Sequence, residues 1–284
     1  TEGGSGDLSR AAWYTPRFVD RGVEADVLPK VSNIVIWSVE GLSSDTVSLG
    51  REGDFAATPN FDLMAGQAGL AVNAWSGGHR SIDGHEAILG PELDRPLASE
   101  LAKMGLVTGF FSSSPTHYRL LADGFESQIR LKGAESSRTG QLLEEIDHWL
   151  YARQKMRFGL YVAVGPELRI PTVQAYSPTE TPLGLDSSQV KRRAQAHGWT
   201  ALNDFWLGQL IAVLERRGRL EDTVVIVVGT ASQRAPQLQT NQTHPHRLHV
   251  PLIVWHPGLK RREKVDPIRG ADLLDIMPTV EGLL

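Results

Sequence analysis

Two stretches of this sequence place residues that could do chemistry where one structural element gives way to the next. Glu40 follows an apolar run at residues 33–38 and is itself followed by Gly41. A carboxylate in that position suits a hard cation, whose preferred ligands are oxygens. A solvated loop acid would give the same pattern, so the position of Glu40 alone does not decide between the two.

The second stretch, residues 77–84, reads GGHRSIDG and precedes an apolar helical segment at residues 85–89. Glycines before a helix start can cradle an anion, because the first N–H groups of the helix point outward. We therefore predict Gly78 and Arg80 as anion-binding residues, Arg80 because a guanidinium can hold two phosphate oxygens. Ser81 is the candidate nucleophile if a metal or base activates it; the alternative is a helix cap.

A third group of candidates lies in the histidine-rich tract at residues 243–249. His244, His246 and His249 could bind zinc, although the spacing within the tract is close for a loop. The alternative is that these are surface histidines, one of them packed against the fold.

Short apolar runs rich in β-branched residues alternate with longer amphipathic stretches, which predicts a mostly parallel central sheet with helices on both faces. The predicted strands are residues 33–38, 106–111, 158–164, 223–228 and 251–255. The clearest predicted helices are residues 59–68, 138–154 and 199–217. In such α/β sheets ligands bind beyond the carboxyl ends of the strands, where Glu40 lies. We expect residues 166–186 to form an ordered loop or lid near that edge.

Composition excludes several classes of protein. The formal charge of −4 and the pI near 6.1 give no electrostatic reason to expect nucleic acid as a partner. Cysteine is absent, which excludes disulfides and thiolate metal sites. No apolar run approaches the roughly 18 residues that span a bilayer. We expect an excised fragment, with residues 1–30 as linker and N-terminal extension and residues 31–284 as one α/β domain.

Taken in order along the chain, these blocks resemble the alkaline phosphatase/sulfatase superfamily. The branch that the sequence most resembles is that of the lipoteichoic acid synthase-like phosphoglycerol transferases. The resemblance lies in residues 33–42, 58–62, 80–89, 98–101 and 105–108, in Asp204, and in residues 220–225, 249–253 and 275–279.

The resemblance implies roles that the residues alone do not establish. Glu40 corresponds to the acidic metal ligand after the first strand, and Ser81 to the nucleophile. Membership also implies a divalent metal (zinc, manganese or magnesium) if the domain is active. It further implies an extracytoplasmic domain, periplasmic or on the outer face of the cytoplasmic membrane, attached to the membrane through segments absent from this chain.

Two departures from the family pattern suggest that the metal site is degenerate. After the run at residues 223–228 the family places an Asp-His pair, where this sequence has Ala231 and Ser232. Alanine has no ligating atom, and a neutral hydroxyl is a poor substitute for imidazole. After residues 158–164 the family carries a histidine-containing segment that holds substrate phosphate, and here that histidine is missing.

These observations leave two hypotheses of different classes. In the first, the domain needs no cofactor and acts as a binding or regulatory module for an anionic lipid or glycan in an envelope pathway. In the second, it is an active metal-dependent transferase or hydrolase of phosphate or sulfate esters. That enzyme would use Ser81 as nucleophile and ligands rebuilt from Glu40 and the histidine tract. A nucleotide-binding fold is disfavoured, because no glycine-rich phosphate loop follows any predicted strand.

Overall fold

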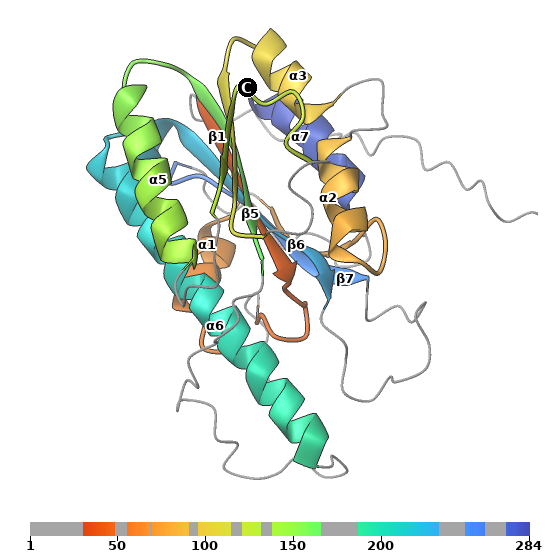
Figure 1. Cartoon of the computed structure of the whole chain (residues 1–284). Helices are drawn as coiled ribbons and strands as arrows, with labels where there is room; N and C mark the ends of the chain where they lie inside the picture. The colour runs from red at the N-terminus through yellow and green to blue at the C-terminus, as the bar shows by residue number, and fades with distance from the viewer. Residues whose placement is uncertain are drawn as a thin grey trace, which may run out of the picture.

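A computed structural model describes residues 31–48, 56–68, 70–90, 96–114, 121–131, 138–165, 187–232, 248–258 and 271–284. Its centre is an eight-stranded sheet in the order β4-β3-β5-β1-β6-β7-β2-β8 (Figure 1). The strands are β1 (Asn33–Gly41), β2 (Leu70–Trp75), β3 (Val107–Ser112), β4 (Ser127–Arg130), β5 (Phe158–Val164), β6 (Thr223–Ser232), β7 (His249–Trp255) and β8 (Ala271–Asp272). The predicted linker at residues 1–30 lies outside the described residues.

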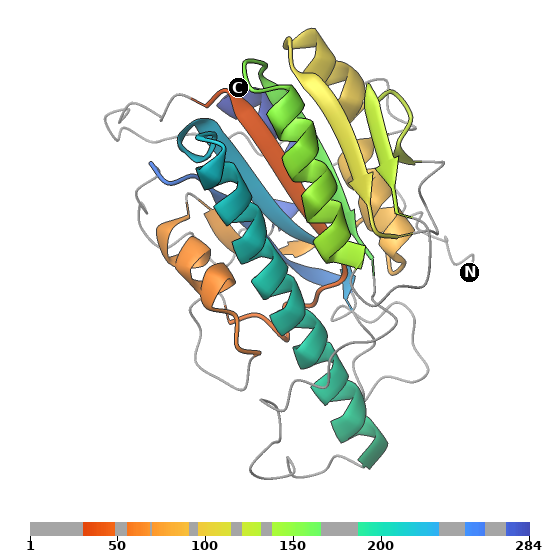
Figure 2. The ribbon, with the colours of Figure 1, turned by 60° about the vertical axis from the view of Figure 1, so that its left-hand side comes forward.

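Helices cover both faces of the sheet, as predicted. Figures 1 and 2 show α1, α5 and α6 on one face, and Figure 1 shows α2, α3 and α7 on the other. The helices are α1 (Pro59–Gln67), α2 (Ser81–Leu89), α3 (Leu97–Lys103), α5 (Arg138–Ala152), α6 (Ser187–Arg216) and α7 (Ile276–Leu283). None of the helices in the described ranges is both long and apolar enough to cross a membrane.

The sheet is mostly parallel, which confirms the predicted fold class. β1 pairs in parallel with both β5 and β6, and β3 with both β4 and β5. One expectation was wrong: the apolar run that we took for another parallel strand is β7, which runs antiparallel to β6 and β2. A strand buried on both faces is apolar throughout whichever way it runs, so its composition does not reveal its direction.

Two apolar layers hold the helices to the sheet, and the alternation of side chains along β1 explains why. Val35, Trp37 and Val39 are buried in the layer under α1, α5 and α6. Ile34 and Ile36 point to the other face and pack in the layer under α2, α3 and α7. Successive side chains of a strand point to opposite faces, so one apolar run fills both layers.

Helix α6 begins at Ser187 rather than at the predicted residue 199. Its first turns are polar and basic and carry no apolar stripe, so hydrophobic periodicity does not reveal them. Figures 1 and 2 show these turns projecting beyond the end of the sheet. Further along α6, Asp204 caps the start of α1. Its Oδ1 accepts a hydrogen bond from the backbone N–H of Phe61 (2.7 Å), and its Oδ2 accepts one from Nδ2 of Asn60 (2.9 Å).

Candidate functional site

Glu40 lies at the carboxyl end of β1, in the centre of the sheet. β1 pairs with β6 along its whole length, and a register shift between Val39 and Glu40 sets Glu40 opposite Ala231. The backbone of Glu40 is fixed from the α6 side, since its carbonyl oxygen accepts a hydrogen bond from Nε1 of Trp199 at 2.8 Å. The residue that follows along β6, Ser232, pairs with Gly41. The position on β6 that pairs with Glu40 therefore carries only the methyl group of Ala231.

The side chain of Glu40 turns toward α2 and meets a buried histidine. Oε1 of Glu40 lies 3.5 Å from Nε2 of His85, within ion-pair range and at the outer limit for a hydrogen bond. The His85 side chain is fully buried, and that of Glu40 is 11 % exposed. The carboxylate is thus directed at the protein interior as well as at the sheet edge.

His85 is in turn held by two hydroxyl groups from neighbouring strands. Its Nδ1 lies 2.7 Å from the Tyr161 hydroxyl of β5 and 3.2 Å from Oγ of Ser38 on β1. The Tyr161 hydroxyl also donates to Oγ of Ser38 at 3.1 Å. All three side chains are completely buried. Burial, more than any other cause, raises the pKa of the Tyr161 phenol well above its ordinary value, so it stays protonated.

Helix α2 reaches this edge because a glycine lets it approach β6 closely. A Cβ on Gly84 would lie 2.0 Å from the carbonyl oxygen of Thr230, which no side chain tolerates. The same carbonyl accepts a hydrogen bond from Oγ of Ser76, in the loop before the helix. Ser81 is the first residue of α2 and half-buried. Because it precedes His85 by four residues, it lies about 6 Å nearer the helix start on the same side.

The predicted anion-binding groups have partners within the protein. The backbone N–H of Gly78 donates to Oγ of Ser76 at 3.4 Å. The backbone N–H of Arg80 donates to Oδ2 of Asp83 at 3.0 Å, and its guanidinium forms an ion pair with the same carboxylate. Burial works to raise the pKa of Asp83, but the hydrogen bonds from Arg80 outweigh it and lower that pKa. Asp83 thus balances the charge of Arg80.

A metal centre at this edge would need several oxygen or nitrogen donors that converge on one point. Nowhere in the described ranges do three His, Asp or Glu side chains come together as a metal-binding group. Of the predicted replacement ligands, His249 is on β7 with its ring against Trp75, at a centroid distance of 4.1 Å. His244 and His246 lie outside the described residues, as does the predicted loop at residues 166–186.

Sequence reasoning missed the side chains that surround Glu40. Tyr161 and Ser38 lie within apolar strands, where each looks like part of the core. His85 looks like a lone polar residue in an apolar helical segment. The available signal was its spacing, because His85 follows the candidate nucleophile Ser81 by four residues and so shares its helix face.

Comparison with known families and structures agrees with the predicted superfamily. The family model described as Sulfatase matches residues 98–284, which is more than half of the chain. The matched region includes β6 and β7 but begins after Glu40 and Ser81. Among curated proteins, none matches this chain significantly in sequence.

Several solved structures share the fold. A protein of the alkaline phosphatase superfamily from Vibrio parahaemolyticus is 21 % identical, with a TM-score of 0.62 over 90 % of this chain and 68 % of that one. The phosphonate monoester hydrolase of Agrobacterium radiobacter is 15 % identical, with a TM-score of 0.71 over 88 % and 73 %. The C-terminal periplasmic domain of EcEptC from Escherichia coli is 13 % identical, with a TM-score of 0.66 over 92 % and 83 %.

Proposed function

Because this chain belongs to the sulfatase family, we propose that residues 31–284 form a degenerate member that has kept the fold and works by binding. Its ligand is an anionic lipid or glycan of the cell envelope, and its role is that of a binding or regulatory module. Its place is outside the cytoplasmic membrane, in keeping with the periplasmic domain among its structural neighbours.

The observation that carries this proposal is the pairing of Glu40 with Ala231 across β1 and β6. Cations held by proteins need several oxygen or nitrogen donors converging on one point. Here the second strand contributes a methyl group where the family resemblance leads us to expect a carboxylate. A zinc complex is known for the EcEptC domain, which has the same fold. In this chain, the carboxylate of Glu40 lies 3.5 Å from Nε2 of His85, a side chain that is buried in the core.

A glycan is a reasonable ligand class for a module of this fold. The structural neighbour i-CgsB has been seen in complex with neocarrahexaose, a carbohydrate, and another neighbour belongs to glycosaminoglycan metabolism. Those ligands belong to those proteins. For this chain they support the choice of sulfated oligosaccharides as the first probes.

An active enzyme is the second candidate, favoured by one observation. Ser81 begins α2 at the same edge as Glu40, one turn from His85 on the same side of the helix. That is where a nucleophile would have to stand to meet a substrate bound beyond the strands. This alternative needs further metal ligands, for which His244 and His246 are the candidates.

The two candidates are separated by assaying the purified domain for ester hydrolysis. The substrates are p-nitrophenyl sulfate, p-nitrophenyl phosphate and bis(p-nitrophenyl) phosphate, each with added zinc, manganese or magnesium. We expect the same background rate for the wild type and for Ser81→Ala. We also expect the wild type to bind sulfated oligosaccharides on an array or vesicles that contain phosphatidylglycerol. A metal-stimulated rate that Ser81→Ala abolishes would overturn the proposal.

A further inference from the structure

We propose that His256 is an acid-sensitive clasp, which holds the end of β7 to the short 3₁₀ turn η1 (Leu220–Asp222) while its ring is neutral. When the ring gains a proton, the turn at residues 256–258 is released. The inference goes beyond the proposed function, because it concerns the amino end of the sheet and holds for a binding module and for an enzyme alike. It rests on two hydrogen bonds between the ring and the backbone.

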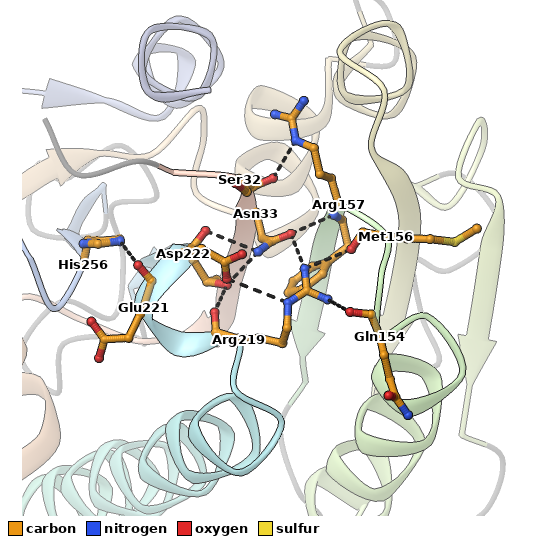
Figure 3. Close-up of polar contacts among 11 residues, drawn as sticks. Ser32, Asn33, Gln154, Met156, Arg157, Arg219, Glu221, Asp222 and His256 are labelled. Atoms are coloured by element: carbon orange, nitrogen blue, oxygen red, sulfur yellow. Dashed lines mark hydrogen bonds and ion pairs between the residues drawn. The ribbon is translucent and has the colours of Figure 1, made fainter.

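His256 directly follows β7, at the edge of the sheet where β6 begins. The ladder between β6 and β7 ends with the pair Val225 and Trp255. Pro257 has no N–H group, so it cannot donate a further ladder hydrogen bond. The His256 ring continues the contact instead, because its Nε2 lies 3.1 Å from the carbonyl oxygen of Glu221 in η1 (Figure 3).

Two backbone groups determine which ring nitrogen of His256 carries the hydrogen. The N–H of Gly258 donates to Nδ1 at 2.9 Å, so Nδ1 is without hydrogen. The carbonyl of Glu221 can only accept, so the ring hydrogen lies on Nε2 and points at that carbonyl. The neutral ring with its hydrogen on Nε2 therefore satisfies both backbone groups, and the other tautomer satisfies neither.

A second proton on the ring would break this arrangement. It would have to bind Nδ1, where it would meet the N–H of Gly258, so that two donors would face each other without an acceptor. His256 is also only 1 % exposed, so the charged ring would have lost most of its hydration. Protonation therefore removes one hydrogen bond of the clasp and adds a cost of burial.

The charges around the ring do not cancel the effect of burial. Burial lowers the pKa of His256 below its ordinary value, although the Glu221 carbonyl and the carboxylates of Glu221 and Asp222 favour the charged ring. Those two carboxylates are the charged groups that face the ring among the described residues, and Oδ1 of Asp222 is itself 3.8 Å from Nε of Arg219.

The sign of the pH dependence follows from this lowered pKa. The unfolded chain binds the proton on His256 more tightly than the folded chain does. The stability that the neutral ring contributes is therefore present above the ordinary histidine pKa and is lost as the pH falls through the folded pKa.

Acid should loosen the end of β7 and leave the start of β1 in place. The next carbonyl of η1, that of Asp222, accepts hydrogen bonds from the backbone N–H of Ser32 (2.9 Å) and from Nδ2 of Asn33 (3.3 Å). Neither donor titrates in this pH range. The alternative is that His256 is only a polar member of the core, and the turn after it would then not respond to pH.

The first test is NMR of the full chain between pH 8 and pH 5, with the signals assigned from the wild type itself. We expect the His256 ring to carry its hydrogen on Nε2 and none on Nδ1 at pH 8. As the pH falls, the Gly258 amide signal should move toward that of an amide without a hydrogen bond, with the same apparent pKa as the ring. A hydrogen on Nδ1 at pH 8, or a Gly258 amide signal that stays constant, would overturn the proposal.

The second test is urea unfolding of the wild type and of His256→Gln at pH 7.5 and pH 5.5. Glutamine does not titrate, and its amide can still donate to the Glu221 carbonyl. We expect the unfolding equilibrium constant of the wild type, relative to that of His256→Gln, to rise at least about threefold at the lower pH.

The matched control is His148→Gln, at an exposed position of α5, which should keep the pH response of the wild type. A ratio between wild type and His256→Gln that stays constant or falls at pH 5.5 would contradict the proposal. Should His256→Gln not fold, the NMR titration of the wild type decides alone.

Discussion

The two ends of the sheet hold their polar side chains in different ways. At the amino end, Arg219 donates to the backbone carbonyls of Gln154 and Met156 and to Oδ1 of Asn33, at 3.2, 2.9 and 2.8 Å (Figure 3). Asn33 in turn donates to the carbonyl of Asp222 and accepts the backbone N–H of Phe158. At the carboxyl end, the polar side chains around Glu40 bind chiefly one another.

This difference separates a fixed end from an adaptable one. Backbone carbonyls cannot move without moving a strand, so the amino end ties the beginnings of β1, β5 and β6 together. Hydroxyl groups and an imidazole can rotate or exchange hydrogens without disturbing the sheet. The amino end is therefore suited to stability, whereas at the carboxyl end the partly exposed carboxylate of Glu40 stays within reach of a ligand.

The largest effect should come from removing Asn33, which is completely buried at the amino end. Asn33→Ala leaves the N–H of Phe158 and the guanidinium of Arg219 short of an acceptor, so we expect a loss of about 3 kcal/mol of unfolding free energy. Urea unfolding measures it. The matched control is Asn203→Ala, since among the described residues this buried side chain donates to a single acceptor, the Trp199 carbonyl within α6. If Asn33→Ala costs no more than Asn203→Ala, the amino end is not the fixed one.

At the carboxyl end, the close approach of α2 should be the sensitive feature. Gly84→Ala would drive a methyl group into the carbonyl of Thr230 and force the helix away from β6, at a cost of about 2 kcal/mol. Gly66→Ala in α1, where nothing lies within 4 Å of the new methyl group, should instead stabilise slightly. Equal effects of the two changes would contradict the packing described.

Asp204 offers a contrast with Glu40, because its buried carboxylate accepts a hydrogen bond from a backbone N–H group, that of Phe61. Burial raises the pKa of Asp204 above its ordinary value, against the hydrogen bonds from Phe61 and Asn60. The folded state therefore binds the proton more tightly than the unfolded state, and the stability contributed by this group falls as the pH rises through the folded pKa. Asp204→Ala should cost about 1.5 kcal/mol near neutral pH and more near pH 4. A loss that grows with pH would be the wrong sign.

The smallest effect is expected for Asp147, which receives two hydrogen bonds from Arg217, at 2.7 and 2.8 Å. The Arg217 hydrogen bonds lower the pKa of Asp147, so its contribution is present above the ordinary carboxyl pKa and is lost as the pH falls through the folded pKa. Asp147→Asn should lower Tm by only about 2 °C near neutral pH, because the pair is partly exposed. The difference should vanish in acid, and one that persists there would point to another cause.

The fold could be predicted because its signals are local. The run at residues 158–164 predicted β5 with the bounds that the structure gives it, and apolar spacing placed α5 to within its last turn. The direction of β7 and the polar start of α6 could not be predicted, since neither leaves a mark in hydrophobic periodicity. The resemblance to the alkaline phosphatase/sulfatase superfamily, argued from blocks along the whole chain, is confirmed by the sulfatase family match, and the narrower branch stays a prediction.

The site was predicted only in part, because its contacts join residues far apart in sequence. Glu40 was recognisable from its place after a strand, whereas its partner His85 lies on another element and is buried. The ion pair between Arg80 and Asp83 could be predicted only once the first residue of α2 was known. The roles of Ser81, Gly78 and the histidine tract stay predictions.

Metal binding by Glu40 is the property that most directly separates a binding module from a metal-dependent enzyme. The decisive measurement is the metal content of the purified domain by elemental analysis, before and after loading with zinc, manganese or magnesium, for the wild type and Glu40→Ala. We predict background metal in both proteins under all conditions. A near-stoichiometric metal in the wild type that disappears in Glu40→Ala would contradict the account.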